Sequence, residues 1–126
     1  MFTYSVKGLY FHTHVRISFK TTKLEKLSNS NIEAFKKLGK QSARKLRTRM
    51  DELDTAITLE DMRFLPAARC HELKGKLQGS LAVNLHDGLR VLFIPDHEPV
   101  PAKDDGGMDW TQINAILITD ITDYHD

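Results

Sequence analysis

Three separate stretches of the chain gather side chains that can transfer protons or hold a phosphate group. They are the segment Arg69–Gly75, which includes His71 and Lys74, then Arg90 inside an apolar stretch, and the terminal Asp123-Tyr124-His125. An imidazole beside a carboxylate transfers protons near neutral pH, and lysine or arginine neutralises charge that develops on a phosphate. These groups together are what metal-free cleavage of RNA requires. A base activates the 2′-hydroxyl, cations surround the phosphorus, and an acid protonates the departing 5′-oxygen.

Each of the three stretches also has a structural explanation that needs no catalysis. A lone histidine in a strand, such as His71, is commonly a hydrogen-bonded structural residue. Arg90 could be an exposed member of an alternating strand, and the last three residues could be a frayed end. The chemistry therefore depends on whether the fold brings the three stretches together.

Metal and thiol chemistry are not expected. Cys70 is the only cysteine, so the chain can form neither an internal disulfide nor a cluster of thiolate ligands. Cys70 precedes His71, but neighbours in a strand point to opposite faces, which favours a buried small residue over a thiolate–imidazole pair. His12 and His14 could join His71 as metal ligands, yet nothing in the spacing defines that geometry. We expect no metal and no cofactor.

The elements that must position these residues begin with a strand and a long helical pattern. Residues 14–20 alternate apolar and polar, as a half-buried strand does. Further on, apolar residues from Ile32 to Ile57 recur at steps of three to five, which predicts helix. Ser30 or Asn31 can cap its start, and Gly39 indicates a possible break into two helices.

The second half of the chain has a strand-like period. Residues 81–85 alternate, Asp87-Gly88 supplies the positive φ angles of a tight turn, and residues 89–94 form the returning strand. Residues 95–110 hold three prolines and a polar Lys-Asp-Asp-Gly-Gly run, which predicts an inserted loop. A last strand over residues 114–121 leads to Asp123. In an antiparallel meander this strand can lie beside that of Arg90, so one composite site is possible.

The order of elements predicts one α+β domain, a small antiparallel β-sheet with the N-terminal helices packed on one face. The length of 126 residues suits one modest core. The apolar stretches are too short to span a bilayer, and the N-terminus lacks a basic-then-apolar signal pattern. We therefore expect a cytoplasmic protein with no membrane contact.

Charge is unevenly divided although the net charge is only +1. Residues 1–50 carry 12 lysines and arginines against 2 acidic residues, whereas residues 51–126 carry 6 against 15. A polyanion would be attracted to the basic half, although such runs are often only a solvated helix surface. The residues predicted to bind RNA or the ribosome are Lys40, Arg44, Lys45, Arg47 and Arg49.

Several short motifs, taken in order, resemble a known family. They are Leu65-Pro66, His71-Glu72-Leu73-Lys74-Gly75, Gly79, Leu89-Arg90-Val91-Leu92-Phe93 and the closing Asp123-Tyr124-His125. This pattern is similar to the HigB branch of the RelE/ParE superfamily, the toxins of type II toxin–antitoxin systems. The resemblance covers residues 15–126, with residues 95–110 as an insertion, and leaves residues 1–14 as an N-terminal extension.

The resemblance implies the RelE-like microbial ribonuclease fold and a ribosome-dependent mRNA endonuclease that inhibits translation. It also implies a helix-turn-helix antitoxin of the HigA type as partner, besides the ribosome and mRNA. By position, His71 would share proton transfer with Asp123 and His125, and Tyr124 would stack on or orient a base. Lys74 and Arg90 would hold the scissile phosphate.

Two other functions remain open. A ParE-like toxin inhibits DNA gyrase by binding and needs no nuclease residues, but the terminal Asp-Tyr-His argues against it. A non-catalytic interaction module of a toxin–antitoxin complex is the other alternative. In many HigB toxins aromatic residues follow the glycine that matches Gly79, whereas this chain has Ser80-Leu81-Ala82. A base-stacking platform is therefore missing at that position.

Overall fold

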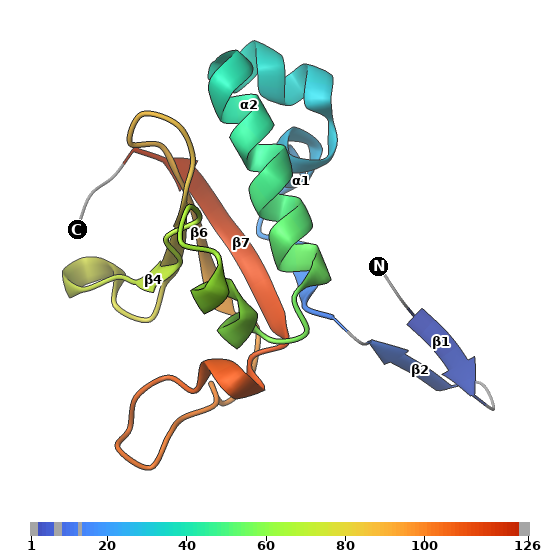
Figure 1. Cartoon of the computed structure of the whole chain (residues 1–126), viewed down its shortest axis with the longest axis vertical. Helices are drawn as coiled ribbons and strands as arrows, with labels where there is room; N and C mark the ends of the chain where they lie inside the picture. Colours follow the sequence, from blue (N-terminus) through green and yellow to red (C-terminus); the bar gives the residue numbers. More distant parts are fainter. Residues whose placement is uncertain (1–2, 7–8, 13, 124–126) are drawn as a thin grey trace.

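Helices pack against one face of a five-stranded sheet, so the predicted α+β class is confirmed (Figure 1). The computed structural model describes residues 3–6, 9–12 and 14–123, and in the first two of these segments only the backbone. The strands are β1 (Thr3–Val6), β2 (Leu9–His12), β3 (Arg16–Phe19), β4 (His71–Glu72), β5 (Leu81–Asn84), β6 (Arg90–Pro95) and β7 (Ala115–Thr122). The helices are α1 (Thr22–Asn29) and α2 (Asn31–Thr55), with the 3-10 turns η1 (Leu59–Phe64), η2 (Gly75–Leu77) and η3 (Trp110–Gln112).

The main sheet has the order β3-β7-β6-β5-β4. Strands β4 to β7 pair antiparallel, as predicted, whereas β3 runs parallel to β7, with Arg16 opposite Ala115. The sheet is therefore mostly antiparallel rather than wholly so. A parallel pair needs a long crossover connection, and helices α1 and α2 start that crossover directly after β3. Strands β1 and β2 form a separate antiparallel pair within the predicted extension.

Helix α1 lies between the predicted strand at residues 14–20 and the predicted long helix, in a stretch for which the sequence analysis predicted no element. Thr21 caps it, since the Leu24 N–H donates to the Thr21 hydroxyl at 3.1 Å. The eight-residue helix has too few apolar residues to show a helical period. Its local signal is therefore the capping threonine rather than a stripe.

Helix α2 begins as predicted and is kinked at the predicted glycine. The Glu33 N–H donates to the Ser30 hydroxyl at 3.2 Å, which makes Ser30 the cap. Gly39 has φ 82° and ψ 168°, a conformation that is essentially confined to glycine. Beyond the kink, one face of α2 is buried against the sheet. Before it, Ile32 and Phe35 are 68% and 56% exposed, so the apolar stripe does not continue into the core there.

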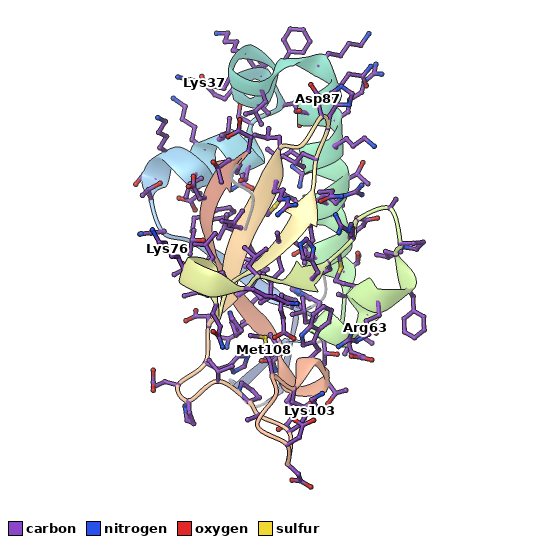
Figure 2. The ribbon with its side chains drawn as sticks, turned by 90° about the vertical axis from the view of Figure 1, so that its left-hand side faces the viewer. Lys37, Arg63, Lys76, Asp87, Lys103 and Met108 are labelled. Atoms are coloured by element: carbon purple, nitrogen blue, oxygen red, sulfur yellow. The ribbon has the colours of Figure 1, made fainter. Side chains whose placement is uncertain are left out.

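The two faces of the sheet have different surroundings. The core lies between the sheet and α2 (Figure 1). Its buried residues include Leu46 and Leu53 of α2 and Val83, Val91 and Phe93 of the sheet. The opposite face is here called the open face, and among the described residues its buried apolar cluster is the small one of Leu73, Leu77, Ala82 and Leu92. Figure 2 looks onto this face, with the strands in front of α2 and Lys76 of η2 beside them. The open face is the surface on which polar side chains can meet a ligand.

Two connections in the second half behave as their residues predict. In the turn between β5 and β6, Asp87 and Gly88 both have positive φ angles, 55° and 82°. The long segment between β6 and β7 folds back on itself, because Ala102 bridges Met108 and the Asp109 N–H donates to the Pro101 carbonyl at 2.9 Å. Within the described part of the chain, none of the helices combines the length and the apolar character that crossing a bilayer would require.

Candidate active site

Strand register brings two of the three predicted clusters onto the open face. His71 lies opposite Ala82, and Ala82 lies opposite Leu92 of the next strand. Arg90 lies two residues before Leu92, opposite Thr122, the last residue of β7. Residues that are directly opposite share a face of the sheet. His71, Arg90 and Thr122 therefore share the open face, and the expected pairing of Arg90 with the last strand is confirmed.

The third cluster is described only at its first residue. Asp123 directly follows Thr122 and is exposed, which places it beside the strand that carries Arg90. Tyr124 and His125 lie outside the described residues, so the roles expected of them stay predictions. Strands in a sheet are about 4.8 Å apart, and residues rise about 3.3 Å along each strand. The Cα atoms of His71 and Arg90 are therefore roughly 12 Å apart.

A backbone carbonyl orients the His71 ring. The Nδ1 atom of His71 lies 2.8 Å from the carbonyl oxygen of Arg69. A carbonyl can only accept a hydrogen bond, so Nδ1 carries a proton and the neutral ring keeps its lone pair on Nε2. The side chain is partly exposed. This geometry prepares Nε2 to act as a general base.

The residue that supplies this carbonyl has an uncommon backbone conformation. Arg69 has φ 47°, in the left-handed region that residues other than glycine rarely adopt. The adjacent Ala68 carbonyl accepts from the Asn84 N–H at 2.8 Å, which ties this bend to β5. Backbone strain of this kind is frequent at functional sites. The bend turns the Arg69 carbonyl toward the His71 ring.

Arg49 of α2 forms hydrogen bonds to the same bend, and this corrects the RNA-binding role that the sequence predicted for it. Its guanidinium donates to the Asn84 carbonyl at 2.8 Å, to the Ala67 carbonyl at 3.0 Å and to the Glu52 carboxylate at 3.0 Å. The residue is 3% exposed. Arg49 is therefore unavailable to RNA, and its charge is used to attach α2 to the segment before His71.

The other predicted RNA-binding residues differ in exposure. Lys40, Arg44 and Lys45 are exposed on α2, and among the described residues none of them forms a salt bridge. Arg47 is partly buried and is held by the Asp51 carboxylate at 3.0 Å and the Ser28 carbonyl at 3.3 Å. The basic surface is thus smaller than the sequence predicted. We call Lys40, Arg44 and Lys45 the basic face.

Lys74 and Arg90 flank the apolar cluster of the open face. Lys74 is exposed and follows Leu73, which packs on Ala82 and Leu92. Arg90 is only 9% exposed, so most of its side chain is enclosed by its surroundings. Both predicted cations therefore lie beside the strands that carry His71 and Thr122.

Asp120 is an open-face residue that the sequence analysis missed. A β-bulge between Leu92 and Phe93 shifts the register of β7, so that Phe93 lies opposite Ile118 but Leu92 lies opposite Asp120. Simple alternation would put Asp120 on the core face with Ile116 and Ile118. No local sequence signal marks the bulge. The exposed carboxylate accepts from the Ile121 N–H at 2.8 Å.

A stacked pair of side chains supports the strand of His71 from its other side. The indole N–H of Trp110 donates to the Glu72 carboxylate at 3.1 Å, and Arg63 stacks over the Trp110 ring at 3.9 Å. Trp110 is 3% exposed. The predicted loop thus contributes a buried residue that fixes the neighbour of His71.

Replacing Trp110 with phenylalanine should lower the free energy of unfolding by about 2 kcal/mol, because it removes the bond to Glu72 and leaves space beside it. Urea unfolding followed by circular dichroism measures this loss. Phe64→Leu is the matched control, since Phe64 is 78% exposed and its replacement should cost less than about 0.5 kcal/mol. Equal stability of the two variants would contradict a supporting role for Trp110.

Cys70 is a poor nucleophile in this site. Burial raises the pKa of its thiol to about 12, with Arg63 lowering that pKa and Glu72 raising it to smaller extents. The thiol therefore stays protonated at neutral pH, as expected of a partly buried structural cysteine. It takes no part in acid–base chemistry with His71.

Alkylation measures this directly. At pH 8 the native chain should react with iodoacetamide about a thousandfold more slowly than the chain unfolded in urea, because its thiol pKa is about 12 against the usual 9.0. The rate is followed by mass spectrometry. Similar rates in the folded and unfolded chain would show that Cys70 is accessible and ionised.

The described residues contain no group of three histidine, cysteine or acidic side chains close enough to hold a metal ion. His14 is buried near Asp54, at 3.9 Å, and not beside His71 on the open face. No family model fits the chain, and no curated protein is significantly similar to it in sequence.

Proposed function

We propose that the chain is an endoribonuclease that cleaves mRNA on the ribosome and so inhibits translation, the toxin of a type II toxin–antitoxin system. The observation that carries the proposal is the open face. There His71, oriented by the Arg69 carbonyl, shares one surface with the nearly buried Arg90 and the end of β7. A proton acceptor and a cation within reach of one nucleotide are the parts that phosphodiester cleavage needs.

In the proposed reaction the Nε2 atom of His71 removes the proton from a ribose 2′-hydroxyl. The 2′-oxygen attacks the adjacent phosphorus, and the bond from phosphorus to the 5′-oxygen breaks. Arg90 and Lys74 neutralise the charge that builds up on the phosphate oxygens. Asp123 or His125 protonates the departing 5′-oxygen. The products are a 2′,3′-cyclic phosphate and a 5′-hydroxyl end, and no oxidant or metal is required.

The uneven distribution of charge suits the ribosome and an antitoxin as the other proposed partners. Lys40, Arg44 and Lys45 are exposed and form no salt bridge with residues 14–123, so they would attract ribosomal RNA independently of its sequence. The acidic second half of the chain offers a surface to a basic protein, and we propose a helix-turn-helix antitoxin of the HigA type as that partner. These partners and the proposed activity belong to the cytoplasm.

A cell-free translation reaction tests the proposal. Purified chain is added to a defined message, and new 5′ ends are mapped by primer extension. We expect new ends within the translated region. The control message is identical except for a replaced start codon, and it should stay intact because its cleavage requires translating ribosomes.

Other outcomes favour the alternatives. If the message stays intact while DNA gyrase loses supercoiling activity, the chain is a gyrase inhibitor. If neither changes, but a helix-turn-helix protein encoded beside it binds the chain, the chain is a non-catalytic module of such a complex. Either result rejects the nuclease.

A further inference from the structure

The kink at Gly39 divides α2 into a first arm, residues 31–38, and a second arm, residues 40–55. An open groove lies between these two arms. The groove has a volume of about 550 Å³ and is lined by Asn31 and Phe35 from the first arm and by Lys40, Ala43, Arg44 and Thr48 from the second. It occurs because Gly39, at φ 82°, redirects the chain between these arms. It lies toward the end of the molecule where Figure 2 labels Lys37. The helix that forms it covers the sheet face opposite His71.

An aromatic ring is exposed in this groove. Phe35 is 56% exposed although residues of its type are mostly buried in folded proteins. Its ring contributes nothing to the core between α2 and the sheet. An exposed phenylalanine at a concave surface is a suitable platform for another flat group.

The cations around the ring are available to a ligand. Lys40 and Arg44 are exposed, and neither forms a salt bridge with any residue between 14 and 123. Arg47 also lines the groove, but Asp51 and the Ser28 carbonyl hold its guanidinium in place. A ligand here would therefore meet two unneutralised positive charges beside the ring.

This combination fits a nucleotide better than a peptide helix. A docked amphipathic helix needs several apolar pockets, one for each apolar side chain along its buried face. Of the residues that line this groove, only Phe35 and Ala43 are apolar. Unpaired bases, in contrast, stack on aromatic rings while lysine and arginine hold the neighbouring phosphates. The amide of Asn31 and the hydroxyl of Thr48 can hydrogen-bond the edge of a base.

We propose that the groove binds an unpaired nucleotide of RNA, with its base on Phe35 and its flanking phosphates at Lys40 and Arg44. The nucleotide belongs to an RNA segment other than the one cut at the open face, because α2 lies on the other side of the sheet. The inference rests on the proposed function for its choice of RNA, but it requires no cleavage.

Binding of a labelled single-stranded oligoadenylate, measured by fluorescence anisotropy, tests this. The full chain carries His71→Ala, so that the probe is not cut. In that background Phe35→Leu should weaken binding about tenfold, since stacking on one ring is typically worth about that much. Phe35→Tyr should retain it. Arg44→Glu should weaken binding and reduce the salt dependence by about 0.7 per lost phosphate contact.

Ile32→Ala is the matched control, because Ile32 is 68% exposed on the same arm but does not line the groove. It should bind as the parent does. Unchanged binding by Phe35→Leu would overturn the proposal. Displacement of the RNA by oligoglutamate, with loss of oligoglutamate binding in Phe35→Leu, would also overturn it and assign the groove to an acidic protein.

The two proposals can fail separately. Binding that depends on Phe35 without any cleavage of translated message would reject the nuclease but keep the groove. Cleavage without binding that depends on Phe35 would reject the groove alone.

Discussion

Replacing His71 with alanine should lower the rate of mRNA cleavage about 10²- to 10⁴-fold, the usual contribution of a positioned general base. The Arg69 carbonyl holds the Nδ1 proton of His71, so in the proposed reaction Nε2 would be the atom that accepts the proton of the 2′-hydroxyl. Alanine keeps the strand but removes this acceptor. The rate is measured in the translation reaction as new 5′ ends per unit time.

His86→Ala is the control for this experiment. His86 is exposed next to the Asp87-Gly88 turn, and no interaction of its ring with the open face is seen in residues 14–123. It should cleave at the wild-type rate. Circular dichroism must show the same unfolding midpoint for both variants. Full activity of a folded His71→Ala chain would remove His71 from the mechanism.

Replacing Arg49 with methionine should lower the free energy of unfolding by about 3 to 5 kcal/mol. Methionine fills much of the same space but leaves the Ala67 and Asn84 carbonyls without their donor and Glu52 without its partner. Stabilities of small domains are about 5 to 15 kcal/mol, so this one change removes a large part of the total. Urea unfolding followed by the fluorescence of Trp110, the only tryptophan, measures the loss.

Arg44→Met, five residues earlier on the same helix, provides the comparison. Arg44 is exposed and should change stability by less than about 0.5 kcal/mol, while weakening the affinity for RNA. If the main role of Arg49 is structural, Arg49→Met should lower the stability, whereas the affinity of the folded chain for RNA should stay the same. Equal stability of the two variants would contradict the structural role of Arg49.

The features that could be predicted from the sequence are those whose causes are local. The Asp87-Gly88 turn needs positive φ angles, and these residue types tolerate them. The Ser30 cap depends on a hydroxyl that accepts a hydrogen bond from the N–H of Glu33, three residues later. The kink at Gly39 follows from the freedom of a residue without a Cβ atom. In each case a few neighbouring residues contain the whole explanation.

The parts that could not be predicted depend on partners far away in the chain. In the sequence, Arg49 is one more positive residue of α2 and looks no different from the exposed Arg44 and Lys45. Only the hydrogen bonds to the Ala67 and Asn84 carbonyls make it a buried residue. Asp120 changes face because of a bulge in the pairing of β6 with β7. A slip of one residue moves a side chain to the other face of a sheet, and no local signal records such a slip.

The sequence by itself determined which chemistry is possible here: histidine, arginine, lysine and a carboxylate, with a single cysteine and an uneven distribution of charge. Residue types and short-range geometry are properties of the chain. Only the tertiary structure decided that His71 and Arg90 share the open face, that the Arg69 carbonyl sets the proton on Nδ1, and that Phe35 is exposed in a groove. These arrangements arise from pairing between distant strands and from packing of α2, whose energies depend on segments far apart in sequence.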